Sequence, residues 1–107
     1  MIQVKYIIQL PVGKTVSDVM SIPGANDLID YFGIFRAYAQ SNSCVVTTEN
    51  ATETNTTTYV YDWQTQHDLD QFYEFANSLT DYAQFTTTFN DLVAQIGGTL
   101  TRTEQEV

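Results

Sequence analysis

The first ten residues strongly limit the possible fold, because apolar and polar side chains alternate along them. The apolar positions are Ile2, Val4, Tyr6, Ile8 and Leu10. A period of two is the pattern of a strand that buries one face. We therefore predict a strand over about residues 2–10, ended by Pro11 and Gly13. Ile7 interrupts the polar side, which indicates that the outer face is partly covered as well.

Three later segments carry apolar residues at spacings of three and four, which predicts amphipathic helices. The expected helices cover about residues 25–40, 66–78 and 82–96, and the stretch before the first is expected to be irregular. Gly33 disfavours the first helix by about 1 kcal/mol relative to Ala. An alternative therefore ends that helix at Gly33 and makes Ile34 to Gln40 a strand. Thr65 and Asp68 resemble a capping box at the start of the second helix.

The middle of the chain predicts a β-hairpin with a loose polar tip. Its two segments, Cys44 to Thr48 and Thr56 to Trp63, are rich in β-branched and aromatic residues. Along the second segment, Thr57, Tyr59, Tyr61 and Trp63 share one face because successive side chains of a strand alternate. A last short strand is expected at Thr99 to Thr103, after the Gly97-Gly98 helix stop.

These elements give the order β-α-β-β-α-α-β in one domain, residues 1–107, a usual length for a single core. The order fits an α+β, ferredoxin-like sandwich, in which helices cover one face of an antiparallel four-stranded sheet.

The strand Tyr59 to Trp63, followed at once by the capped helix from Thr65 to Ser78 and a second helix, resembles the dimeric α/β-barrel superfamily. That superfamily includes cofactor-independent monooxygenases and small stress-response proteins. The resemblance implies a homodimer in which two sheets pack face to face around a pocket. It also implies that the aromatic strand face is a pocket wall or an interface.

Charge and composition exclude several classes of partner. Four basic against thirteen acidic residues give a net charge of −9, which opposes direct binding to nucleic acid or anionic lipid. No apolar run approaches the roughly 20 residues of a membrane span, and no signal peptide is visible, so we expect a soluble cytoplasmic protein. No phosphate-binding glycine loop or zinc pattern is present, and no cofactor is expected.

Few side chains suggest chemistry. His67 is the only histidine and a weak candidate for an acid or base. Asp62, at a strand end, could converge with Asp68 and Asp70 of the following helix on Mg²⁺ or Ca²⁺. Asp68 and Asp70 are instead read as acids that stabilise the first turn of that helix, so no metal site is expected. The single cysteine, Cys44, is read as a small buried apolar residue.

Aromatic side chains are the remaining candidates for ligand binding, because small-molecule sites are mostly apolar. They are Tyr6, Tyr59, Tyr61 and Trp63. The sequence favours a homodimeric binding or accessory protein that encloses a small apolar ligand between sheet and partner. One alternative is a cofactor-independent monooxygenase acting on an aromatic substrate, with His67 nearby. Another is an acidic decoy that occupies the nucleic-acid site of a partner protein.

Overall fold

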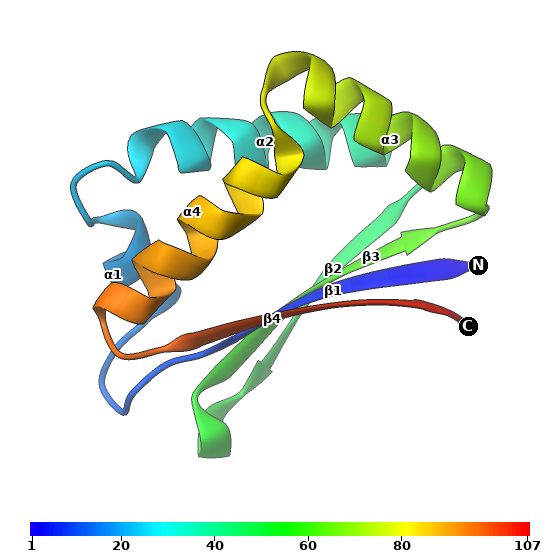
Figure 1. Cartoon of the computed structure of the whole chain (residues 1–107). Helices are drawn as coiled ribbons and strands as arrows, with labels where there is room; N and C mark the ends of the chain where they lie inside the picture. Colours follow the sequence, from blue (N-terminus) through cyan, green and yellow to red (C-terminus); the bar gives the residue numbers. More distant parts are fainter.

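The computed structural model describes all 107 residues and is an α+β fold with one four-stranded antiparallel sheet. The strands are β1 (Ile2–Gln9), β2 (Val45–Ala51), β3 (Thr56–Trp63) and β4 (Thr99–Glu106). They lie in the order β2-β3-β1-β4, so β1 and β3 are central and β2 and β4 are edges. Figure 1 shows the helices on one face of the sheet and the two chain termini side by side. The predicted α+β class and antiparallel sheet are confirmed.

The covering layer consists of four helices, none of which is long and apolar enough to cross a membrane. They are α1 (Val16–Met20), α2 (Asn26–Ser41), α3 (Gln66–Leu79) and α4 (Tyr82–Gln95). The alternative that made Ile34 to Gln40 a strand is wrong, because α2 continues through Gly33. Burial of Leu28 before the glycine and of Phe35 after it places one continuous apolar stripe on the core. That packing outweighs the cost of about 1 kcal/mol for a helical glycine.

The predicted element order must be corrected to β-α-α-β-β-α-α-β, because α1 forms where an irregular stretch was expected. Its start is a complete capping box. The Thr15 N–H donates to Asp18 Oδ2 at 2.7 Å, and the Asp18 N–H donates to Thr15 Oγ1 at 3.3 Å. Val19 is the one fully buried residue of this helix. A five-residue helix with a single buried side chain shows no periodic apolar stripe, so the periodicity could not reveal it.

The two faces of the sheet differ in character. The register pairs Val4 with Tyr61 and Tyr6 with Tyr59, so these side chains share the helix-covered face. They join the core with residues from all four helices. No element of the chain covers the opposite face (Figure 1), although Ile7 had indicated a covering there. Ile7 is half-buried between its cross-strand neighbours Thr58 and Thr101.

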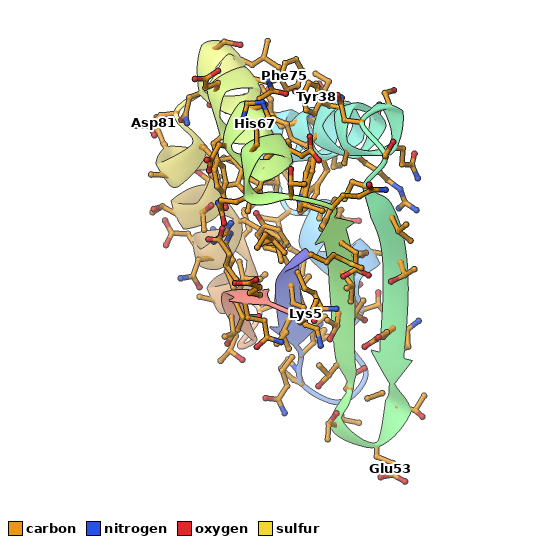
Figure 2. The ribbon with its side chains drawn as sticks, turned by 90° about the vertical axis from the view of Figure 1, so that its right-hand side faces the viewer. Lys5, Tyr38, Glu53, His67, Phe75 and Asp81 are labelled. Atoms are coloured by element: carbon orange, nitrogen blue, oxygen red, sulfur yellow. The ribbon has the colours of Figure 1, made fainter.

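The β2–β3 hairpin also fixes the connection that leads into α1. A short 3₁₀ turn, Thr52–Thr54, ends at Asn55, which adopts a left-handed conformation with φ of 49°. The Asn55 Nδ2 group donates hydrogen bonds of 2.7 Å to Pro11 O and 2.9 Å to Lys14 O. The loop after β1 is therefore fastened to the base of the hairpin tip. Figure 2 shows Glu53 at this tip, at the opposite end of the molecule from the helices that carry Tyr38 and Phe75.

Candidate functional site: a groove between α1, α2 and β3

The four aromatic residues predicted to bind a ligand all lie on the helix-covered face of the sheet. Trp63 is 1% exposed and packs against Phe72 of α3, with ring centroids 5.2 Å apart. Tyr6 is similarly buried, whereas Tyr59 is half-buried. The aromatic face of β3 is thus covered by the chain's own helices. Tyr6, Tyr61 and Trp63 belong to the core, whereas Tyr59 packs against its border.

The interior beneath these aromatic residues is closely packed. The void between sheet and helices, bordered by Tyr6, Tyr61 and Trp63, measures about 20 Å³. A space of that size holds about one water molecule. A planar aromatic ligand therefore does not fit into the centre of the fold.

A larger hollow of about 280 Å³ lies at the border of the core, between α1, α2 and β3. We call it the α1–α2–β3 groove. It is lined by Val16, Met20, Ile29, Phe32, Gly33, Arg36, Tyr59 and Tyr61. Six of these eight residues are apolar, and none is acidic. Two other hollows, of about 250 and 360 Å³, are lined mainly by polar side chains.

Gly33 helps to keep the groove open. A Cβ atom placed on it would meet no other heavy atom within 4 Å, so the missing side chain leaves free space beside α2. Its backbone has ordinary helical geometry, and the glycine is not required by a left-handed conformation. A larger side chain at this position would therefore extend into the groove without straining the helix.

Two tyrosine hydroxyls border the groove without a partner in the protein. The tyrosine hydroxyls that make hydrogen bonds within the chain are those of Tyr6, Tyr31, Tyr73 and Tyr82. Tyr61 is only 8% exposed, yet no fully buried polar side-chain atom lacks a partner, so its hydroxyl must reach solvent. The groove is the open surface that Tyr61 lines. Tyr59 and Tyr61 thus both line the groove, and neither hydroxyl is engaged by a partner within the chain.

The electrostatics of the groove combine burial with one positive charge. Burial raises the pKa of Tyr61 to about 12, and it also raises the pKa of Tyr59. The nearby positive charge of Arg36 offsets part of this rise for both tyrosines, because it favours their ionised form. Both hydroxyls thus stay protonated at neutral pH and can donate hydrogen bonds.

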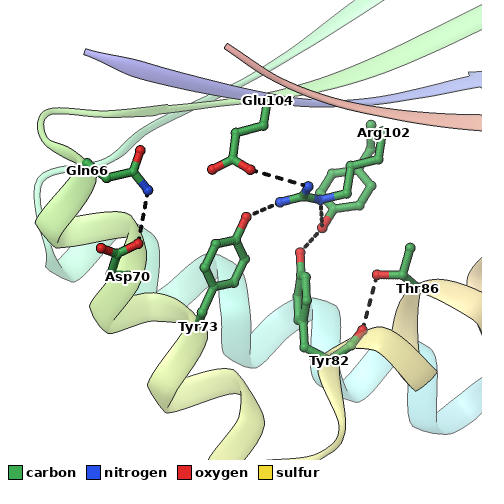
Figure 3. Close-up of polar contacts among 8 residues, drawn as sticks. Gln66, Asp70, Tyr73, Tyr82, Thr86, Arg102 and Glu104 are labelled. Atoms are coloured by element: carbon green, nitrogen blue, oxygen red, sulfur yellow. Dashed lines mark hydrogen bonds and ion pairs between the residues drawn. The ribbon is translucent and has the colours of Figure 1, made fainter. Parts of the chain in front are cut away.

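A second polar cluster, which the sequence did not predict, lies between β4 and the helices α3 and α4 (Figure 3). The Arg102 guanidinium donates hydrogen bonds to Tyr6 and Tyr73, and the hydroxyls of Tyr6 and Tyr82 are bonded to each other. The Cζ atom of Arg102 lies 5.6 to 5.9 Å from the ring centroids of Tyr6, Tyr73 and Tyr82. Glu104 forms an ion pair with it at 3.8 Å. We call this set the Arg102 cluster.

The Arg102 cluster is satisfied within the protein. Each of its three hydroxyls has a partner, and the void of about 20 Å³ beneath the sheet, which Tyr6, Tyr82 and Arg102 border, is too small for a ligand. Burial raises the pKa of Tyr73 to about 12, against the opposing effect of the Arg102 charge. Burial also raises the pKa of Tyr6, so the hydroxyls of Tyr6 and Tyr73 stay protonated near neutral pH. We therefore read the cluster as a link between the sheet edge and the helices.

The remaining candidates are not brought together. His67 lies exposed in the first turn of α3 and lines neither the groove nor the interior void. Asp62 accepts a hydrogen bond from Gln3 at 3.0 Å, and Asp70 accepts one from Gln66. No group of three or more acidic, histidine or cysteine side chains is placed to hold a metal ion. Cys44 is 5% exposed, and burial raises the pKa of its thiol to about 12.

Sequence reasoning missed the wall of the groove opposite the tyrosines. Val16 and Met20 belong to α1, which was not predicted. Ile29 and Arg36 are on α2. Their spacing could have revealed them, because residues 29, 32, 33 and 36 are three or four positions apart and lie on one side of a helix. An arginine within such a stripe, in a chain with four basic residues, could have drawn attention to it.

Fold and groove together define the class: a small α+β protein with one apolar surface hollow bordered by a cation. No protein-family model matches the chain, and no curated protein matches its sequence significantly. The geometry of the groove is therefore the main indication of what the protein binds.

Proposed function

We propose that the protein binds a small, mainly apolar molecule in the α1–α2–β3 groove. The observation that carries this proposal is the exposed apolar hollow of about 280 Å³ with the unpartnered hydroxyl of the almost buried Tyr61 at its border. Small-molecule sites combine such apolar walls with a few placed polar groups. The volume is close to the lower end of their usual range, about 300–1,000 Å³. The ligand is accordingly a small one.

The apolar lining supplies a driving force for binding. Each Å² of apolar surface removed from water contributes about 25 cal/mol. Met20 and Phe32 are partly buried residues that pack against the core, so their remaining exposed surface is held in place by the fold. A preformed wall reduces the entropy that binding would otherwise cost. The eight lining residues come from three elements, α1, α2 and β3.

We extend the proposal to the fold family. The ferredoxin-like assignment is supported by two helical connections between strands that are not neighbours in the sheet. One connects β1 to β2 and the other connects β3 to β4. If α1 is treated as an addition to the first connection, and α3 and α4 together count as the second, the element order reduces to β-α-β-β-α-β. Membership of the dimeric α/β-barrel superfamily remains part of this proposal.

The homodimer expected from that resemblance also remains a prediction. The open face of the sheet would be its interface, and its larger apolar side chains are Ile7, Val45 and Val60, of which Val45 is the exposed one. Light scattering coupled to size-exclusion chromatography over a range of protein concentrations will decide between monomer and dimer. A monomer at all concentrations would contradict the dimer and leave the groove proposal intact.

The other functions have less support. A monooxygenase that uses His67 would need this side chain at the ligand, and His67 does not line the groove. The acidic decoy is supported only by the net charge of −9. Ligand binding in the groove is thus the function that the geometry favours.

The experiment is a fragment screen observed by ¹H–¹⁵N NMR, with apolar aromatic and aliphatic fragments. We expect hits to shift the backbone amide signals of Gly33 and of its neighbours in the groove. Gly33→Leu places a branched side chain in the middle of the hollow and should strongly reduce these shifts. Gly33→Ala is the matched control: it should retain binding and stabilise α2 by about 0.5–1 kcal/mol. Hits that persist in Gly33→Leu, or that map elsewhere, would contradict the proposal.

A further inference from the structure

Arg36 is a basic side chain without an ionic partner in a very acidic protein. The chain has thirteen acidic and four basic residues, and its one ion pair joins Arg102 to Glu104. Arg36 is exposed and forms no ion pair, and no acidic residue lines the groove beside it. The groove is therefore a place where a positive charge stands unneutralised next to an apolar surface.

The position of Arg36 on α2 gives the groove a direction. Ile29, Phe32 and Arg36 follow one side of the helix at spacings of three and four residues. Seven residues of α-helix span about 10 Å at a rise of about 1.5 Å per residue. Val16 and Met20 of α1 add further apolar surface to the groove, whereas Arg36 is its only charged residue. The groove thus offers apolar walls along its length and a cation at one end of the helical stripe.

The positive charge of Arg36 also acts on the hydroxyl groups of Tyr59 and Tyr61 on β3. The Arg36 guanidinium is close enough to lower the pKa values of Tyr59 and Tyr61 against the larger effect of their burial. Neither hydroxyl has a hydrogen-bond partner in the chain, and the residues Tyr59 and Tyr61 line the groove together with Arg36. A guanidinium and two tyrosine hydroxyls are all hydrogen-bond donors.

From this arrangement we infer that the ligand is an amphipathic carboxylate, with its anionic group at Arg36 and the Tyr59 and Tyr61 hydroxyls and its apolar body along the Ile29–Phe32 stripe. The inference rests on the proposed function and specifies the class of ligand. A guanidinium binds a carboxylate through two parallel hydrogen bonds, and such charge-assisted bonds are stronger than neutral ones. A ligand of about 10 Å, with one charge at its end, matches the length of the stripe.

Paired probes test the inference: 4-phenylbutyrate and its neutral counterpart 4-phenylbutyramide, each titrated up to about 10 mM while the Gly33 amide signal is followed. We expect the carboxylate to bind about tenfold more tightly than the amide. Arg36→Gln should weaken binding of the carboxylate about tenfold and leave the amide within about twofold. Lys5→Gln, which removes the same charge from the opposite face of the sheet, should leave both affinities within about twofold.

The outcomes separate the inference from the proposed function. If both probes bind with equal affinity and Gly33→Leu abolishes both, the groove binds apolar ligands but the carboxylate inference is overturned. An equal loss of carboxylate affinity in Arg36→Gln and Lys5→Gln overturns it as well, because the effect then reflects net charge alone. If neither probe shifts Gly33 while other apolar fragments do, the carboxylate inference alone is overturned; if no fragment of the screen shifts Gly33 either, the proposed function fails with it.

Discussion

The Arg102 side chain donates a hydrogen bond of 3.4 Å from Nε to the hydroxyl of Tyr6, its cross-strand partner on the helix-covered face of the sheet. This bond joins the edge strand β4 to the central strand β1. The same guanidinium reaches Tyr73 of α3, and the Tyr6 hydroxyl reaches Tyr82 of α4. One arginine therefore connects two strands with two helices.

We expect Arg102→Met to lower the free energy of unfolding by about 2 kcal/mol. The substitution removes the hydrogen-bond donor to the hydroxyls of Tyr6 and Tyr73. It also removes the positive charge beside the aromatic rings of Tyr6, Tyr73 and Tyr82. Urea denaturation followed by circular dichroism measures the change. Glu104→Gln is the control: its ion pair is partly exposed, and we expect a loss of about 0.5 kcal/mol or less. Equal losses in the two variants would show that the ion pair, and not the tyrosine contacts, carries the stabilisation.

The secondary structure could be predicted largely from the sequence, because most elements bury one regular face. The alternation from Ile2 onward and the apolar stripes of α2, α3 and α4 each gave an element of the right kind. The predicted edge strands were too short. β2 continues through Glu49 to Ala51 and β4 to Glu106, since hydrogen bonding to β3 and β1 extends a strand whatever its exposed side chains are.

The candidate site was less predictable, because the groove is made by residues from three separate elements. The aromatic alternation identified Tyr59 and Tyr61 but also placed Tyr6 and Trp63 beside them, and only the helices above decide which of the four are core. The partners of Arg102 lie on β1, α3 and α4, between 20 and 96 residues away along the chain. Contacts over such separations leave no local pattern in a single sequence.

Stability should fall as the pH rises from about 10 to about 12. Burial raises the pKa values of Tyr61 and Tyr73 to about 12 in the folded chain, above the usual value of about 10 in an unfolded one. The folded state therefore holds these protons more tightly. Its advantage is complete below pH 10 and is lost as the pH approaches 12. Urea midpoints measured across this interval will give the slope, and Tyr61→Phe should make it shallower. A stability that does not change above pH 10 would contradict the prediction.

The thiol of Cys44 should be unreactive in the native protein. It is almost fully buried, and burial, aided by the negative charge of Asp62, raises its pKa to about 12. The thiolate that attacks disulfide reagents is thus nearly absent at neutral pH. With Ellman's reagent at pH 8, we expect slow reaction in buffer and rapid reaction in denaturing urea. Rapid reaction of the folded protein would show that the thiol is accessible and ionised.

Removal of the Thr15 cap should weaken ligand binding, because it loosens α1, which forms part of the groove wall. Thr15→Ala eliminates the Oγ1 acceptor at the start of α1, the helix that supplies Val16 and Met20 to the groove. We expect a loss of about 1 kcal/mol in stability and at least about a threefold weaker affinity for 4-phenylbutyrate, because a loosened wall must be ordered on binding. Urea denaturation and the NMR titration measure the two effects.

Thr65→Ala is the matched control for this prediction. Thr65 Oγ1 accepts a hydrogen bond of 3.1 Å from the Asp68 N–H at the start of α3, and α3 does not line the groove. Its loss should cost a similar free energy of unfolding, about 1 kcal/mol, with an unchanged affinity. Because each variant removes a threonine hydroxyl that accepts a backbone N–H at a helix start, a difference in affinity between them reports on the position of the helix and not on stability. If both variants bind 4-phenylbutyrate as the parent protein does, α1 is not part of the binding site.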